Sequence, residues 1–117
     1  MEKAQAVTAL AALAQDNRLD VFRLLVQAGP EGLPAGQVAL KLGLPPNTLT
    51  FHFDRLRMAD LVTVRREGRS MIYAARFDTM NAVLAFLTEN CCAGVGQGCA
   101  APSCKPAPKR RRVKETV

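Results

Sequence analysis

The sequence has no hydrophobic run that approaches the length of a membrane span. Its alanine-rich start, residues 4–14, is short and is interrupted by Gln5 and Thr8, while Glu2 offsets the charge of Lys3. These features differ from those of a secretory signal peptide and fit an amphipathic helix. We therefore expect a cytoplasmic protein that has no membrane partner.

Cysteine is absent from the first 90 residues, and histidine occurs once, as His52. The chain has no Cys-x-x-Cys motif before a predicted helix, no phosphate-binding loop and no histidine near its cysteines. Activated thiols need such neighbours, so these absences argue against an enzyme. In a cytoplasmic chain, a late cluster of thiols predicts metal or redox chemistry rather than structural disulfides. The cluster consists of Cys91, Cys92, Cys99 and Cys104.

Large apolar residues are scarce near the C-terminus, where glycine and proline follow Ala93 and a basic run covers 109–112. We expect two parts: residues 1–92 form one folded domain, and residues 93–117 form a flexible basic tail. A domain this small buries a modest share of its surface, so a partner subunit would help to stabilise it. The basic run either adds non-specific affinity for nucleic acid or is simply solvated.

The net charge of +6 is concentrated in two segments. Residues 55–76 carry six arginines against two acidic residues, and residues 105–117 carry six cations against one acidic residue. Residues 1–54 and 77–104 are each slightly acidic. Such segregation of positive charge predicts a polyanionic partner, most commonly nucleic acid.

Apolar residues recur at helical spacing in the first half of the chain. Asp16 is placed to cap the second helix, and Pro34 lies in the first turn of the third. A tight Gly-Leu-Pro-Pro link joins the third and fourth helices, which is typical of a helix-turn-helix. The predicted helices cover residues 4–14, 16–28, 33–42 and 45–59.

Two segments rich in β-branched residues follow, at 61–66 and 70–75, with Glu67-Gly68-Arg69 as a hairpin turn. Asp78 is then placed to cap a last helix that runs toward the cysteines. The sequence therefore predicts a mainly α fold with a small β-hairpin. Its order is ααααββα, that of a winged helix-turn-helix.

The fourth helix has the surface that a DNA-recognition helix needs, with polar groups outside and Leu49, Phe53 and Leu56 inside. A solvated surface helix is the alternative, but three arginines of the hairpin are placed for phosphate or minor-groove contact. We expect His52 to bond to DNA, since it is too far from the cysteines to share a metal with them. The predicted DNA-binding residues are Asn47, Thr48, Thr50, His52, Arg55, Arg65, Arg66 and Arg69.

Residues 47–56, 59–62, 65–69 and 72–73 together resemble the ArsR/SmtB family of metal-responsive repressors. The Thr-Phe-His-Phe run at 50–53 matches that family's Ser-x-His pattern, with threonine in place of serine. The resemblance implies a homodimer that binds double-stranded operator DNA and leaves it when an inducer binds. We expect the first and last helices to pack across the twofold axis through Val7, Leu10, Ala14, Val83, Leu84 and Leu87.

The family places its inducer sites in different elements, and two of them are missing here. Residues 33–42 contain no cysteine, and residues 78–90 contain no histidine. The remaining thiols suit trivalent arsenic, which prefers three thiolates. We expect Cys91, Cys92 and Cys99 to bind it, with Cys104 as a possible substitute and the glycines at 94–98 folding the loop back. A redox switch, a zinc or cadmium thiolate site, and incidental thiols remain the alternatives.

Overall fold

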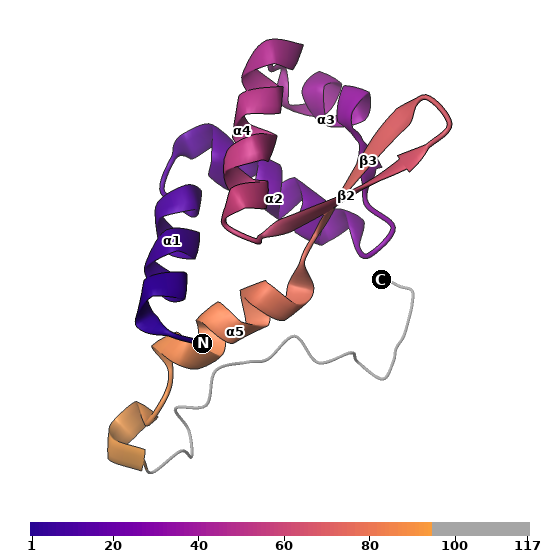
Figure 1. Ribbon diagram of the computed structural model, residues 1–117. Coiled ribbons are helices and arrows are strands. Elements are labelled where there is room, and N and C mark those ends of the chain that lie inside the picture. The colour runs from indigo at the N-terminus through magenta and orange to yellow at the C-terminus, as the bar shows by residue number, and fades with distance from the viewer. Residues whose placement is uncertain (95–117) are drawn as a thin grey trace.

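The computed structural model describes residues 1–94 of the 117-residue chain (Figure 1). In this part, helices and a small sheet follow one another in the order of a winged helix-turn-helix, which confirms the predicted fold class. The predicted tail covers residues 93–117, and its part from residue 95 onward, with Cys99 and Cys104, lies outside the described residues. The elements are α1 (Lys3–Leu13), α2 (Asp16–Ala28), β1 (Leu33–Pro34), α3 (Ala35–Leu42), α4 (Pro46–Met58), β2 (Val62–Glu67), β3 (Ser70–Ala75), α5 (Phe77–Leu87) and a 3₁₀ turn at Cys91–Gly94.

Local signals explain where α3 and α4 meet. Gly43 ends α3 in the left-handed conformation, with φ of 65°, and its N–H donates to the carbonyl of Ala39. Pro46 then occupies the first position of α4, where its missing N–H costs nothing. The predicted boundaries of the helix-turn-helix are therefore confirmed to within a few residues.

Two predicted helix caps are wrong by one or two positions. Gln15, rather than Asp16, caps α2, and its side chain accepts a hydrogen bond of 2.9 Å from the Arg18 N–H. Arg76 occupies the N-cap position of α5 without a capping hydrogen bond from its side chain, and Asp78 lies inside the first turn. Both aspartates still lie near the positive end of a helix dipole, which their charge favours.

The sheet has three antiparallel strands in the order β1-β3-β2. Leu33 and Pro34, expected as the start of the third helix, instead pair with Tyr73 and Ile72 of β3. Pro34 is tolerated because β1 is an edge strand and needs fewer ladder donors. The predicted hairpin is confirmed, with Glu67 opposite Ser70 at its tip, but it gains this short third strand.

The core lies where α2, α4 and the sheet meet. Val21, Leu25 and Leu56 are fully buried there, as is Leu61 at the entry to β2. Burying each such side chain contributes about 1.5–3 kcal/mol. The Phe53 ring of α4 stacks on the Tyr73 ring of β3, with centroids 3.7 Å apart and planes at 3°. The core therefore joins the fourth helix directly to the hairpin.

Helices α1 and α5 bury few side chains against the core and leave other apolar side chains exposed. Helix α1 packs through Ala6, Ala9 and Ala12, and only Val83 of α5 is buried. Val83 was expected in a dimer contact, but it lies in the core because α5 turns that side toward the domain. No helix among the described residues is long and apolar enough to cross a membrane.

Candidate nucleic-acid interface

Helix α4 has one buried and one exposed face. The buried face consists of Leu49, His52, Phe53 and Leu56, and it fixes the rotation of the helix about its axis. The exposed residues of α4 are Pro46, Asn47, Thr50, Phe51, Asp54, Arg55, Arg57 and Met58. The N-terminal half of this face therefore presents the polar groups that a recognition helix needs.

Side chains on this face already make local contacts. The Thr50 hydroxyl donates to the carbonyl of Pro46 at 3.0 Å, so its oxygen can still accept a hydrogen bond. The Arg55 guanidinium carbon lies 5.1 Å from the centroid of the Phe51 ring, a cation–π distance. Thr48 is half-buried, whereas Asn47 is exposed. Asn47, Thr50 and Arg55 therefore have the best access to DNA.

His52 does not face outward as expected. Its side chain is only 5% exposed, and neither ring nitrogen has a hydrogen-bond partner. Burial lowers the pKa of His52 from its ordinary 6.5, and the charge of Arg18 lowers it further. The imidazole is packed inside the domain and does not reach the surface of α4 where a direct hydrogen bond to DNA was expected.

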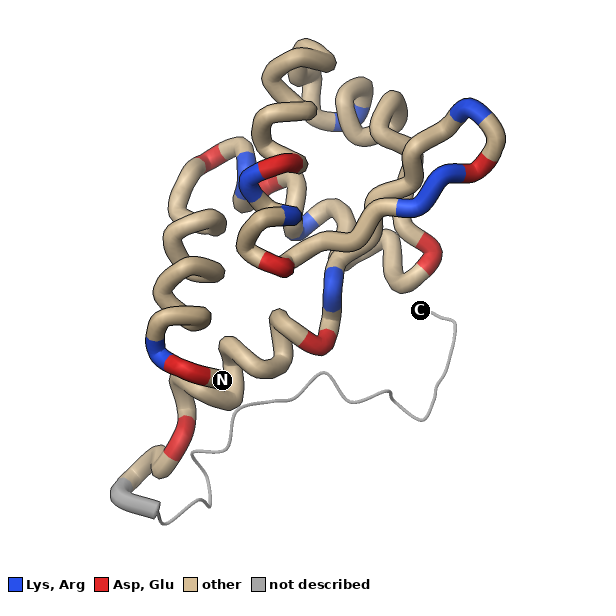
Figure 2. The backbone as a smooth tube through the Cα atoms, viewed as in Figure 1, with Lys and Arg blue, Asp and Glu red and all other residues tan. Residues whose placement is uncertain are grey.

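The three hairpin arginines differ in their contacts. Arg65 donates to the Glu67 carboxylate at 2.8 Å and to the Glu31 carbonyl at 2.9 Å, which ties the hairpin to the loop before β1. Arg66 donates to the Gly68 carbonyl at 3.3 Å. Arg69 makes no hydrogen bond or ion pair within residues 1–94. Figure 2 shows this charge along the projecting hairpin, where Arg66 and Arg69 are best placed to bind phosphate.

Two exposed cations of the helix-turn-helix were not singled out from the sequence. Lys41 lies in the last turn of α3, close to the turn, and Arg57 lies 3.9 Å from Asp54 on α4. Their position within the two helices of the motif is the signal that could have identified them. Both can contact the DNA backbone without carrying sequence information.

The cysteine pair follows the last helix. Helix α5 ends at Leu87, and Asn90 and Cys92 adopt left-handed backbone angles, with φ of 58° and 56°. Because the chain leaves the α-helix there, the Sγ atoms of Cys91 and Cys92 approach to 3.5 Å. No group of three or more potential metal ligands occurs within residues 1–94, and the expected ligands Cys99 and Cys104 lie outside that range.

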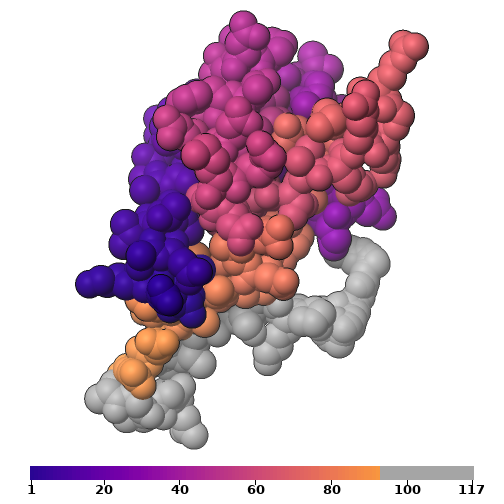
Figure 3. Space-filling model, in the orientation of Figure 1, coloured from indigo at the N-terminus to yellow at the C-terminus, as the bar shows by residue number. Residues whose placement is uncertain are grey.

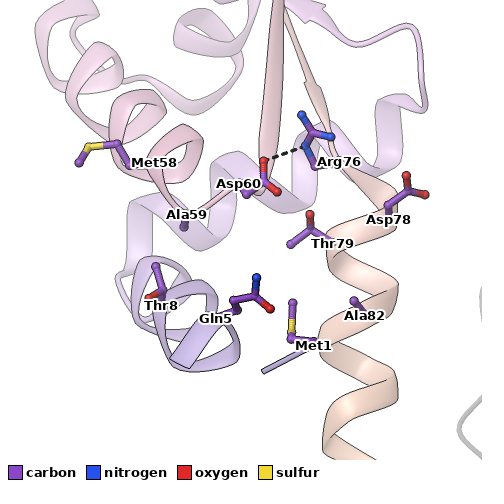
Figure 4. Close-up of a pocket in the computed structure, with 10 residues that line it drawn as sticks. All are labelled: Met1, Gln5, Thr8, Met58, Ala59, Asp60, Arg76, Asp78, Thr79 and Ala82. Carbon is purple, nitrogen blue, oxygen red and sulfur yellow. Dashed lines mark ion pairs between the residues drawn. The ribbon is translucent and has the colours of Figure 1, made fainter. Parts of the chain in front are cut away.

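A hydrogen bond and an ion pair link the segment that follows α4 to the start of α5. The Arg76 N–H donates to the Leu61 carbonyl at 2.8 Å, and its Nε lies 3.1 Å from a carboxylate oxygen of Asp60. Figure 4 shows this ion pair at one side of a hollow of about 420 Å³ between α1, the end of α4 and α5. Gln5 of α1 and Thr79 of α5 also line the hollow. The start of α5 is therefore bonded directly to the segment that follows α4.

Comparisons with known proteins agree with this architecture. Residues 13–65 match a family described as a helix-turn-helix domain. The uncharacterized HTH-type transcriptional regulator YceK of Bacillus subtilis is 34% identical over 73 residues, which are 62% of this chain and 72% of that protein. This relative is a transcriptional regulator, which places the function of this chain in gene regulation.

Solved structures show the same fold. An ArsR-like transcriptional regulator from Rhodococcus superposes with a TM-score of 0.64 at 24% identity, covering 72% of this chain and 76% of that one. The homodimeric winged helix-turn-helix domain of Mb0332 from Mycobacterium bovis, a possible ArsR-family regulator, superposes with a TM-score of 0.61 at 24% identity, covering 73% and 77%. The sequence match shows that this chain belongs to the HTH-type transcriptional regulators, and the solved structures show that it has the winged helix-turn-helix fold of ArsR-like regulators.

Proposed function

We propose that this regulator is a repressor that leaves its operator when trivalent arsenic binds its C-terminal cysteines. The observation that carries the proposal is the 3.5 Å separation of the Cys91 and Cys92 sulfurs. Two thiolates that each bond one soft centre at about 2.3 Å lie at most about 4.6 Å apart. The pair therefore meets the distance requirement for binding one atom.

Sulfur-only ligands favour a thiophilic centre over hard ions. Cys99 supplies the third thiolate in this proposal, and Cys104 is its possible substitute. Cys92 is disulfide-bonded in this structure, so a thiol reductant must first convert it to the thiol. Because thiolates are the binding species, capture by the reduced cysteines then releases protons and strengthens as the thiols ionise. Inorganic arsenite is therefore the first inducer to test.

DNA binding is assigned to α4 and the hairpin. Asn47, Thr48, Thr50 and Arg55 approach base edges in the major groove, while Arg66 and Arg69 contact phosphates or the minor groove. Arg65 positions the hairpin, because its guanidinium already bonds to Glu67 and Glu31. His52 supports the packing of α4 from inside.

A homodimer fits the exposed apolar side chains of α1 and α5. Val7, Leu10, Leu84 and Leu87 are between 39% and 58% exposed, and Figure 3 shows that α1 and α5 meet at one end of the molecule. The Mycobacterium bovis relative is homodimeric. A twofold dimer would set two α4 helices at half-sites about 34 Å apart.

Replacing Leu84 by glutamate is expected to weaken the dimer, because it places a charge in an apolar contact. Sedimentation at micromolar concentration should then show monomer, whereas the wild type should be dimeric. Leu40→Glu is the matched control, since Leu40 is 83% exposed on α3, away from the proposed contact. Wild-type protein that sediments only as monomer would contradict the assignment.

Replacing Arg69 by alanine is expected to weaken binding to all DNA sequences and to reduce the salt slope by about one unit per protomer. The measurement is operator affinity between 50 and 200 mM salt. Lys3→Ala is the control, because Lys3 is an exposed cation at the start of α1 and should leave the slope unchanged. An unchanged slope for Arg69→Ala would show that this residue does not contact phosphate.

Release is transmitted through α5. Drawing Cys91 and Cys92 onto arsenic together with a third thiolate changes the chain directly after α5, and the start of α5 is bonded to Leu61 and Asp60. If arsenite lowers operator affinity by about 1–3 kcal/mol, operator DNA must lower arsenite affinity equally. This reciprocity gives the mechanism a quantitative check.

The double variant Cys91→Ser, Cys92→Ser is expected to bind operator DNA normally and to lose release by arsenite. Fluorescence anisotropy of a labelled operator duplex under reducing conditions measures both properties. Cys104→Ser should behave like the wild type in both respects. Continued arsenite release of the double variant would overturn the proposal.

The same assay separates the alternatives. Release by an oxidant that a thiol reductant reverses, without release by arsenite, would assign a redox switch to the cysteines. Release by zinc or cadmium at concentrations where arsenite is inactive would assign a thiolate metal site. Either result would replace arsenic as the inducer while leaving the DNA-binding assignment intact.

A further inference from the structure

An exposed aromatic side chain lies on the outer face of the recognition helix. Phe51 is one of six phenylalanine and tyrosine residues in the chain, and it is 50% exposed. Asn47 lies four residues before Phe51 and Met58 lies seven residues after it, so the three residues share one side of α4. Phe51 is therefore one turn beyond Asn47, within the helical half that approaches base edges in winged helices.

The Phe51 ring is held by its neighbours. The Arg55 guanidinium carbon lies 5.1 Å from the ring centroid, and the His52 ring approaches edge-on, with centroids 5.7 Å apart and planes at 60°. His52 is buried and fixed by the packing of α4. A side chain ordered before binding loses little conformational entropy on binding, so an exposed ring in this position is suited to recognition.

The surroundings of Phe51 combine positive charge with apolar side chains, among them Val7, Ala11 and Met58. Phe51 lines a shallow hollow between α1 and α4 together with Arg18 and Arg55, and no acidic residue is among those that line this hollow in the described part of the chain. Two arginines beside an exposed ring suit a ligand that combines phosphate charge with flat or methylated bases.

We propose that Phe51 is a specificity-determining residue that recognises the 5-methyl group of a thymine in each operator half-site. The inference rests on the proposed placement of α4 in the major groove. A phenyl ring can neither donate nor accept a conventional hydrogen bond, and the thymine methyl is the apolar group that base pairs present in that groove. Asn47 and Thr50 then supply the hydrogen-bonding part of recognition on either side.

The test replaces single thymines by deoxyuridine, which removes only the methyl group. An operator is first selected from random duplexes with the wild-type protein, and each thymine of a half-site is then replaced in turn. We expect one position at which affinity falls about fourfold per half-site, the effect of exposing about one methylene group. Replacement in both half-sites should reduce affinity about fifteenfold.

Variants assign the effect to Phe51. Phe51→Ala should bind thymine and deoxyuridine operators equally, while its affinity for non-specific DNA and its salt slope match those of the wild type. Met58→Ala is the matched control, because Met58 is 75% exposed on the same side of α4, two turns farther from its N-terminus. This variant should retain the fourfold discrimination.

Equal binding of thymine and deoxyuridine at every position by the wild type would overturn the inference, as would unchanged discrimination by Phe51→Ala. A weaker dimer with unchanged discrimination would instead place Phe51 in a contact between subunits and would also overturn it. Selection that enriches no duplex would contradict operator binding itself. Release of DNA from the Phe51→Ala protein by arsenite tests the proposed arsenic site separately. A failure of the arsenic proposal can therefore be told apart from a failure of the thymine proposal.

Discussion

Gly32→Ala is expected to lower the free energy of unfolding by about 3 kcal/mol. Gly32 has a φ of 74°, and a Cβ atom built on it would lie 2.3 Å from the Tyr73 carbonyl oxygen and 2.9 Å from its carbonyl carbon. Left-handed backbone costs a non-glycine residue about 1–2 kcal/mol, and overpacking adds about 1–3 kcal/mol. The neighbours that must move are backbone atoms of β3, so the clash cannot be relieved by a side-chain rotation.

Urea unfolding followed by circular dichroism measures this loss. Gly36→Ala is the matched control, because Gly36 lies in α3 and a Cβ atom there would meet nothing within 4 Å. Alanine in a helix is favoured over glycine by about 0.5–1 kcal/mol, so this variant should be slightly more stable than the wild type. Equal stability of Gly32→Ala and the wild type would show that β1 does not approach β3 as described.

His52→Leu is expected to raise the free energy of unfolding by about 1–3 kcal/mol. Both ring nitrogens of His52 are buried without a hydrogen-bond partner, and a buried polar group left in that state costs about this much. Leucine has nearly the same volume and removes the unsatisfied atoms. The comparison is made by urea unfolding at pH 8, where the histidine is neutral in both the folded and the unfolded chain.

The advantage of His52→Leu should grow as the pH falls below 6.5. The folded pKa of His52 is lowered by burial and by Arg18, so in this range the unfolded chain takes up a proton before the folded chain does. Wild-type stability therefore falls between the ordinary pKa of 6.5 and the lowered folded value, and it does not change through this group above that window.

His52→Gln separates the two contributions. Glutamine keeps buried polar atoms but does not titrate, so this variant should lose the acid-dependent difference without gaining the stability of the leucine variant. Parallel stability curves for the wild type and His52→Leu between pH 8 and 5 would contradict the burial of a neutral imidazole.

Local patterns predicted the helix-turn-helix and the hairpin because their signals lie within each element. Pro46 and Gly43 mark the helix boundaries, and β-branched residues around Gly68 mark the hairpin. The strand at Leu33 could not be predicted this way. Its pairing with Tyr73 joins segments far apart in the sequence, and two residues carry no periodicity of their own.

The spacing of residues along α4 indicates that His52 is buried, but the polarity of its side chain favoured an exposed position. Positions 49, 52, 53 and 56 follow the i, i+3, i+4, i+7 pattern of a buried face, and the structure buries all four. A family resemblance in the same run favoured a DNA contact. The sequence alone does not bring the sulfurs of Cys91 and Cys92 together, because adjacent residues of a helix point apart. They can approach because α5 ends before them, at Leu87.

The stacking of Phe53 on Tyr73 constrains the DNA as well as the protein. Because these rings pack the fourth helix against strand β3 of the hairpin, the two elements proposed to face DNA are held against each other. A duplex that binds both must match their arrangement through its own bend and groove width. Base pairs between the contacted segments, which no side chain touches, would then influence affinity through their deformability, and flexible pyrimidine–purine steps there would be favoured over stiff A-tracts.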